Sequence, residues 1–124
     1  MDSPMTRPHI KVLEKTTSDC LLELTVPSSL LYFKGHFDEL PILPGITQVD
    51  WVIAFAKTYL GISNTFCDMR QLKFQQLIQP EDIIKLSFSF SDQTNTLTFK
   101  YFSDENGVHS SGKITYLPLT GKAN

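Results

Sequence analysis

Three residues that can move protons or hold charge follow one another between positions 36 and 50. His36 comes first, Gly45 follows it by nine residues, and Asp50 follows it by fourteen. Histidine exchanges protons near neutral pH, and a carboxyl group in an apolar setting can stay protonated and act as an acid. A backbone amide at the start of a helix can hold a developing oxyanion. Together these groups could remove a proton next to a carbonyl group and expel a hydroxyl group.

Each of the three also has an ordinary structural explanation. His36 could be a packed histidine among aromatic residues, and Gly45 could be a turn glycine. Asp50 could lie on a solvated helix face and pair with Lys57 two turns later. A stabilising contact with the helix dipole explains Asp50 less well, because that effect fades within the first turn. The combination of the three residues is what favours acid–base chemistry.

One long helix must carry Gly45 and Asp50. Pro44 and Gly45 predict where it starts, and Gly61 predicts where it ends. Apolar residues at helical spacing cover most of its circumference: Ile46, Val49, Val52, Ile53, Ala56, Tyr59 and Leu60, with Trp51 and Phe55 on another side. The remaining stripe consists of Thr47, Asp50, Ala54 and Lys57. We therefore expect a helix that is buried over most of its surface, with the Asp50 carboxyl group desolvated.

The rest of the chain predicts strands and one functional loop. Residues 28–44, which include His36, have no regular period but many apolar side chains, as expected of a packed loop that serves a function. Alternating apolar and polar residues indicate strands at 20–26, 84–90 and 97–101, and further strand-like runs lie at 9–15, 66–75 and 108–117. A sheet must bury one face, and the long helix is the available cover. We expect one α+β domain over residues 1–124, a six-stranded antiparallel sheet wrapped around the helix, with loose ends at 1–8 and 119–124.

Composition excludes several classes of function. The chain has 124 residues, 41% of them hydrophobic, and a net charge of −2, which does not favour a nucleic-acid partner. It has no apolar run long enough to span a membrane, no secretory signal, no zinc-ligand spacing and no phosphate-binding glycine loop. Cys20 and Cys67 are expected to be reduced and mostly buried. The sequence indicates a cytoplasmic domain without a metal or nucleotide cofactor.

The loop and the helix start resemble a known family. The segments GHF at 35–37 and PG at 44–45, with Pro41 and Asp50, are similar to the hot-dog-fold 3-hydroxyacyl-[acyl carrier protein] dehydratases of the FabA/FabZ type. The string PILPGITQVDW is most similar to the small ApeI-like dehydratases of aryl polyene pathways. Two departures stand out. Asp38 occupies the position of a family proline, and the helix acid is Asp, as in the branch that also isomerises its product.

The resemblance implies a reaction and a set of roles. A 3-hydroxyacyl thioester on acyl carrier protein would become a trans-2-enoyl thioester, in fatty acid or aryl polyene-type biosynthesis. His36 would be the base, the Gly45 amide would hold the thioester oxygen, and Asp50 would be the acid. The substrate would be carried on phosphopantetheine, and no other cofactor is implied. The acyl tunnel would be lined by Phe33, Phe37, Pro44, Trp51 and Phe55.

The resemblance also implies partners. Lys34, Arg70 and Lys73 would meet the acidic carrier protein. Family members form a double hot dog, so we expect a homodimer, or a heterodimer with a related hot-dog subunit, in which one subunit supplies the histidine and the other the acid.

Three alternatives stay open from the sequence. The aromatic residues assigned to the tunnel could be plain core. The protein could be a hot-dog acyl thioesterase, because the same fold hosts both activities. It could also be a non-catalytic acyl-binding subunit.

Overall fold

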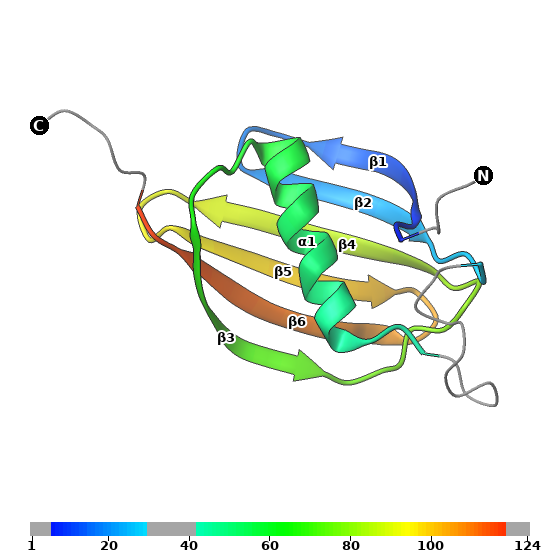
Figure 1. The fold of residues 1–124 in the computed structure, drawn as a ribbon. Helices are drawn as coiled ribbons and strands as arrows, with labels where there is room; N and C mark the ends of the chain where they lie inside the picture. The colour runs from blue at the N-terminus through cyan, green and yellow to red at the C-terminus, as the bar shows by residue number, and fades with distance from the viewer. Residues whose placement is uncertain (1–5, 30–41, 119–124) are drawn as a thin grey trace, which may run out of the picture.

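The computed structural model describes residues 6–29 and 42–118. The described part contains one helix and six strands (Figure 1). In chain order they are β1 (His9–Lys15), β2 (Asp19–Thr25), α1 (Gly45–Leu60), β3 (Phe66–Phe74), β4 (Ile83–Ser91), β5 (Thr96–Ser103) and β6 (Gly107–Tyr116). All the elements expected from the sequence are present, with ends shifted by a few residues.

The six strands form one antiparallel sheet in the order β1-β2-β4-β5-β6-β3. The helix α1 lies across one face of this sheet, and β1 and β3 are its two edges (Figure 1). The helix connects β2, which lies near one edge of the sheet, to β3, which forms the other edge. It therefore crosses the sheet from one side to the other. The expected fold, a single central helix against a six-stranded antiparallel sheet, is confirmed.

The core forms where the alternating strands meet the helix. The expected inward positions of β2, β4 and β5 are buried: Cys20, Leu22, Leu24, Ile84, Leu86, Phe88, Leu97, Phe99 and Tyr101. The helix contributes Val49, Trp51, Val52, Phe55 and Ala56 to the same cluster. Burying each large apolar side chain contributes about 1.5–3 kcal/mol, so this contact fixes the helix on the sheet.

Both helix ends are set by local chemistry. Pro44, with φ −61° and ψ 147°, is the N-cap, and its carbonyl accepts hydrogen bonds from the amides of Thr47 and Gln48, both at 3.1 Å. At the other end Gly61 has φ 68°, a left-handed conformation that glycine adopts without strain. Amides there bond back to the carbonyls of Lys57 and Ala56. The expected start and end of the helix are therefore confirmed.

The edge strand β3 is irregular. Its pairing with β6 shifts twice, and Gln71, inside the second shift, has a positive φ of 55°. Such bulges are common at sheet edges, where they bend the strand and disturb regular pairing. The expectation of two mostly buried cysteines is wrong for Cys67, which is exposed on this edge, whereas Cys20 is buried. An edge strand has a neighbouring strand on one side only, so its side chains are less covered than those of inner strands. The sequence alone does not show that β3 is an edge strand.

Residues 6–8, which lead into β1, contact the helix. The Trp51 indole Nε1 donates to the Thr6 carbonyl at 3.0 Å, and Pro8 is buried. Residues 6–8 therefore lie against the helix, which corrects the expectation of a loose segment for this part of the chain. Residues 1–5 and 119–124 lie outside the described residues.

Candidate active site at the start of the helix

The first turn of α1 opens onto a cavity. The cavity has a volume of about 410 Å³ and is lined by Ile42, Leu43, Gly45, Gln48, Phe74, Gln75, Gln76 and Leu77. This volume is within the range of small-molecule sites in proteins. Apolar side chains dominate its wall, and Gly45 brings the start of the helix to its surface. An acyl group could therefore be held next to the backbone amides of the first turn.

The Gly45 amide lies at the start of α1, on the wall of this cavity. It is at the first helical position, where no preceding turn provides an acceptor, and no other described residue accepts a hydrogen bond from it. The helix dipole places partial positive charge at this end. The absence of a side chain at Gly45 also leaves room for the Phe74 ring: a Cβ atom there would lie 2.8 Å from Cε1 and Cζ of Phe74. These features suit an oxyanion donor beside an aromatic wall.

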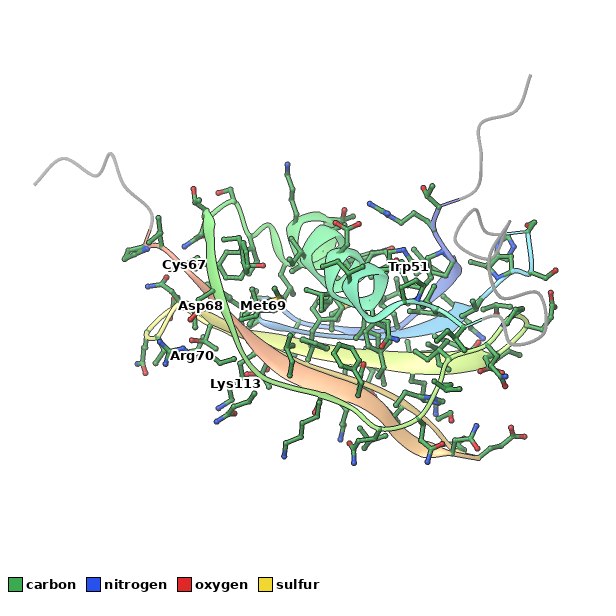
Figure 2. The ribbon with its side chains drawn as sticks, turned by 60° about the horizontal axis from the view of Figure 1, so that its bottom comes forward. Trp51, Cys67, Asp68, Met69, Arg70 and Lys113 are labelled. Carbon is green, nitrogen blue, oxygen red and sulfur yellow. The ribbon has the colours of Figure 1, made fainter. Side chains whose placement is uncertain are left out.

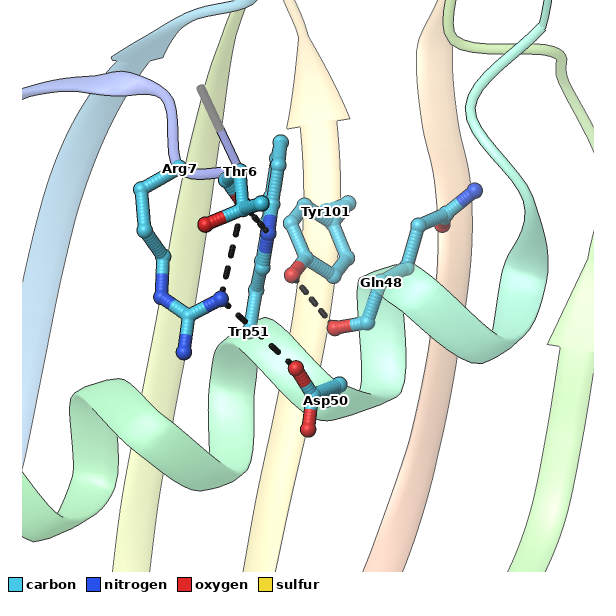
Figure 3. Close-up of polar contacts among 6 residues, drawn as sticks. All are labelled: Thr6, Arg7, Gln48, Asp50, Trp51 and Tyr101. Atoms are coloured by element: carbon cyan, nitrogen blue, oxygen red, sulfur yellow. Dashed lines mark hydrogen bonds and ion pairs between the residues drawn. The ribbon is translucent and has the colours of Figure 1, made fainter. Parts of the chain in front are cut away.

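Asp50 lies on a different surface of the helix. Its side chain is 63% exposed, and its Oδ2 is 3.7 Å from Nη1 of Arg7, as Figure 3 shows. The ion pair considered from the sequence, with Lys57, is replaced by this one with the lead-in segment. Asp50 lines a second hollow with Ile53, Ala54, Lys57, Ile62, Ser63, Asn64, Phe66 and Tyr116. The expected desolvation of Asp50 is therefore not found within the single chain.

The exposed part of the helix surface differs from the expected one. Ile46 is 71% exposed, although it was placed on the apolar face. Thr47 and Gln48 are buried instead, at 5% and 4% exposure. The helix is thus rotated so that Ile46, Asp50 and Lys57 face outward. An exposed isoleucine beside an acid indicates a surface that a partner could cover.

Trp51 and Phe55, two residues expected to line the acyl tunnel, belong to the core of the single chain. Trp51 has no exposed surface and Phe55 is 4% exposed. Neither lines the cavity at Gly45. Their packing is what the plain-core interpretation describes, and their contact with substrate stays a prediction. Pro44 acts through its carbonyl, which caps the first turn.

The two cationic residues of β3 expected to contact the carrier protein are both exposed. Arg70 pairs with Asp68 at 3.6 Å. It also lines a hollow with Lys113 on the face of the sheet opposite α1 (Figure 2). Lys73 directly precedes Phe74, which is part of the wall of the cavity at Gly45. The remaining expected site residues, His36, Phe33, Phe37 and Lys34, lie outside the described residues, as does Asp38.

Three residues of this region were missed in the sequence. Gln48 is buried, its side chain bonds to the Leu43 carbonyl and the Ser110 hydroxyl, and its own carbonyl accepts from Tyr101. Its spacing from Trp51, Val52 and Phe55 is that of one helix face, which is the signal that could have identified it. Phe74 and Arg7 carried no comparable signal, because their contacts with the helix depend on the tertiary fold.

Burial shapes the ionisation of Tyr101 beneath the helix. Its hydroxyl donates to the Gln48 carbonyl at 2.6 Å (Figure 3). Burial raises the pKa of Tyr101 well above its ordinary value, and the charge of Asp50 raises it further, while Arg7 lowers it. Tyr101 is therefore a neutral donor that holds the first turns of α1 on β5.

No group of three or more His, Cys, Asp or Glu side chains is placed to hold a metal ion within residues 6–29 and 42–118. The helix in those residues has neither the length nor the apolar stretch needed to cross a bilayer.

Known proteins resemble this chain in sequence and in structure. A stretch of 69 residues is 33% identical to the 3-hydroxyacyl-[acyl-carrier-protein] dehydratase FabZ of Chlamydia caviae, covering 48% of this chain and 45% of that protein. The match thus spans about half the length of the curated relatives. A chain of the dehydratase heterocomplex ApeI:P from Xenorhabdus doucetiae superposes with a TM-score of 0.81 at 31% identity, covering 88% of this chain and 96% of that one.

An uncharacterised protein from Erwinia carotovora subsp. atroseptica gives a TM-score of 0.77 at 34% identity, covering 90% of this chain and 97% of that one. The sequence profile of the ApeI-like family, described as ApeI dehydratase, matches residues 12–113. The match includes the whole of α1 and most of the sheet. The chain therefore belongs to the ApeI-like dehydratase family.

Proposed function

We propose that this protein dehydrates a 3-hydroxyacyl thioester, carried on acyl carrier protein, to the trans-2-enoyl thioester. Membership of the ApeI-like dehydratase family supports the reaction class, and similarity to FabZ supports the carrier-bound substrate. The observation that carries the proposal is the Gly45 amide on the wall of the apolar cavity, which donates to no acceptor within the described residues. An amide at a helix start stabilises the negative charge that develops on a thioester oxygen when C2 loses its proton.

The proposed mechanism is an elimination. His36 takes the proton from C2, and the electron pair of that bond forms an enolate whose oxygen is held by the Gly45 N–H. The enolate electrons then form the C2–C3 double bond, and the C3–O bond breaks. Asp50 gives its proton to the departing hydroxyl group, which leaves as water. Each positioned acid or base contributes roughly 10²–10⁴-fold in rate, and an oxyanion donor about 10²–10³-fold.

The placement of Asp50 supports a site shared between two chains. Asp50 faces away from the Gly45 cavity of its own chain and is exposed beside the apolar Ile46. The neighbouring edge strand β3 ends in Phe66 and Phe74, which are 42% and 53% exposed. A second hot-dog subunit that covers this surface would desolvate Asp50 and bring it next to the partner's histidine. The partner is either a second copy of this chain or a related hot-dog subunit, and the similar dehydratase ApeI:P from Xenorhabdus doucetiae is a heterocomplex.

A turnover assay separates this reaction from its alternatives. The purified protein, alone and with a related hot-dog subunit, is given 3-hydroxyacyl thioesters of several lengths. Dehydration forms an enoyl thioester without releasing free thiol, and Asp50→Asn should abolish it. Thiol release would instead identify a thioesterase, and binding without either product would identify an acyl-binding subunit.

A further inference from the structure

Gln48 is a buried amide with both ends of its side chain engaged. Its Nε2 donates to the Leu43 carbonyl at 3.2 Å, and its Oε1 accepts from the Ser110 hydroxyl at 2.6 Å. Both Gln48 and Ser110 are buried, at 4% and 0% exposure. A buried polar pair in an otherwise apolar core contributes little net stability compared with apolar packing, but it specifies one geometry. The geometry that this pair specifies is that of the first helical turn.

Gln48 acts on the first turn through two carbonyl groups. Its side chain holds the Leu43 carbonyl, while the Leu43 amide donates to Ile78 at 2.7 Å, so both sides of Leu43 are fixed. Its backbone amide donates to the Pro44 carbonyl at 3.1 Å. That carbonyl belongs to the same planar peptide group as the Gly45 N–H, and the two point in opposite directions. This backbone bond, which any residue at position 48 can make, directs the Gly45 N–H outward, and the side-chain bond of Gln48 holds Leu43, the residue before Pro44.

The residues next to Ser110 hold the opposite wall of the cavity. The His109 carbonyl accepts from the amides of Gln75 and Gln76, at 2.8 and 3.2 Å. The His109 ring is buried and donates from Nδ1 to the Leu77 carbonyl at 3.1 Å. His109 thus holds the cavity wall at residues 75–77 through hydrogen bonds. Its neighbour Ser110 holds the start of the helix through its hydrogen bond to Gln48. These two adjacent residues of β6 therefore set the distance between the helix start and the wall at residues 75–77.

We propose that Gln48 is a positioning residue, which sets the direction of the Gly45 amide and its distance from the wall at residues 75–77. This inference rests on the proposed function, because it assigns the amide a thioester oxygen to hold. It predicts that the loss of the Gln48 side-chain bonds lowers turnover more than substrate binding. A displacement of reacting groups by about 1 Å can cost roughly 10²-fold in rate.

The test compares Gln48→Met with Thr47→Val. Methionine has a similar length to glutamine and removes both side-chain hydrogen bonds. Thr47 is the neighbouring buried residue, and its hydroxyl makes no hydrogen bond to another described residue, so Thr47→Val is the matched control. Ser110→Ala removes one of the two bonds and leaves the bond from Gln48 to Leu43. It also serves in place of Gln48→Met if that variant does not fold.

Two readouts are needed for each variant. We expect kcat of Gln48→Met to fall about 10- to 100-fold with KM changed by less than about threefold, a smaller fall in Ser110→Ala, and no fall in Thr47→Val. The ¹H–¹⁵N resonance of the Gly45 amide should move in the same order. An unmoved Gly45 resonance in folded Gln48→Met would overturn the proposal, whatever happens to turnover. The resonance decides this even if the wild-type protein dehydrates no substrate, a result that would contradict the proposed function alone.

Discussion

Gly45 and Asp50 lie five residues apart on α1 but face different hollows of the surface. Five residues correspond to a separation of about 140° around a helix. The hollow at Gly45 is walled by Phe74 and Leu77, and the hollow at Asp50 by Phe66 and Tyr116. We therefore propose that an elimination site using both groups draws them from two chains.

Mixing two inactive variants should restore activity. His36→Ala lacks the base and Asp50→Asn lacks the acid, so a mixed dimer contains one intact site. Equal amounts that exchange freely should regain roughly a quarter of the wild-type sites, because half of the dimers are mixed and each has one good site of two. The measurement is enoyl thioester formation after co-refolding, with each variant alone as the control. If mass-tagged subunits are shown to exchange and no activity returns, the shared site is wrong.

Gly45→Ala should destabilise the fold only while Phe74 is present. The added Cβ would lie 2.8 Å from two ring atoms of Phe74, so the ring must move, at a cost of about 1 kcal/mol in the free energy of unfolding. In a Phe74→Ala background the same change should be neutral or stabilising, since alanine favours a helix more than glycine does. Urea unfolding of the four proteins gives the coupling energy. Additive effects within about 0.3 kcal/mol would show that the two residues do not meet.

Alkaline pH should unfold the protein partly through Tyr101. Burial and the charge of Asp50 raise the pKa of Tyr101, and burial also raises the pKa of Tyr116. An unfolded tyrosine ionises near pH 10, at about its ordinary pKa. Above that pH unfolding releases protons, so the free energy of unfolding falls by up to about 1.4 kcal/mol per pH unit for each tyrosine. The sign follows because the folded state keeps the proton that the unfolded state has lost.

The variant Tyr101→Phe separates these effects. At neutral pH its free energy of unfolding should be lower than that of the wild type by about 1 kcal/mol, because the hydrogen bond to the Gln48 carbonyl is lost. Above pH 10 its free energy of unfolding should fall less steeply than that of the wild type, while Tyr116 still contributes. Denaturant unfolding between pH 7 and 11 gives both numbers. Parallel curves for the two proteins would contradict the assignment to Tyr101.

The contacts of the lead-in should differ in strength. Arg7→Gln removes an exposed ion pair, so it should change the free energy of unfolding by less than about 1 kcal/mol. Trp51→Phe should cost more, about 1–3 kcal/mol, because it removes core volume and leaves the Thr6 carbonyl without its indole donor. Urea unfolding compares the two variants. An Arg7→Gln effect as large as that of Trp51→Phe would mean that the ion pair, rather than the indole, holds the segment.

The local parts of this fold were predictable from the sequence. Gly61 ends α1 in a left-handed conformation that few other residues favour, and Pro44 and Gly45 mark its start, so the helix range followed directly. The strands followed from the alternation of apolar and polar residues. The apolar ones, such as Leu22, Leu24, Leu86 and Phe88, are buried in the core. The family followed from the GHF and PG segments and their spacing to Asp50, which the match to the ApeI-like family confirms.

The parts that depend on tertiary packing were not predictable. The rotation of α1 that exposes Ile46 and buries Gln48 is set by the sheet beneath it, and apolar residues lie on too many sides of the helix to choose one. The exposure of Asp50 follows from the same rotation. The cavity at Gly45 needs Phe74, which is distant in sequence and reaches the helix because β3 pairs with the last strand. The roles of His36 and the loop around it stay predictions.

Water loss from an intact thioester tests the central claim most directly. A 3-hydroxyacyl thioester on carrier protein is incubated with the wild-type protein in deuterated water, alone and with a related hot-dog subunit, and analysed by mass spectrometry. Reversible elimination predicts a product lighter by one water with its thioester intact. It also predicts deuterium at C2 of the recovered substrate, and Asp50→Asn should form no dehydrated product. Release of free thiol, or unchanged substrate without deuterium under every condition, would contradict the account.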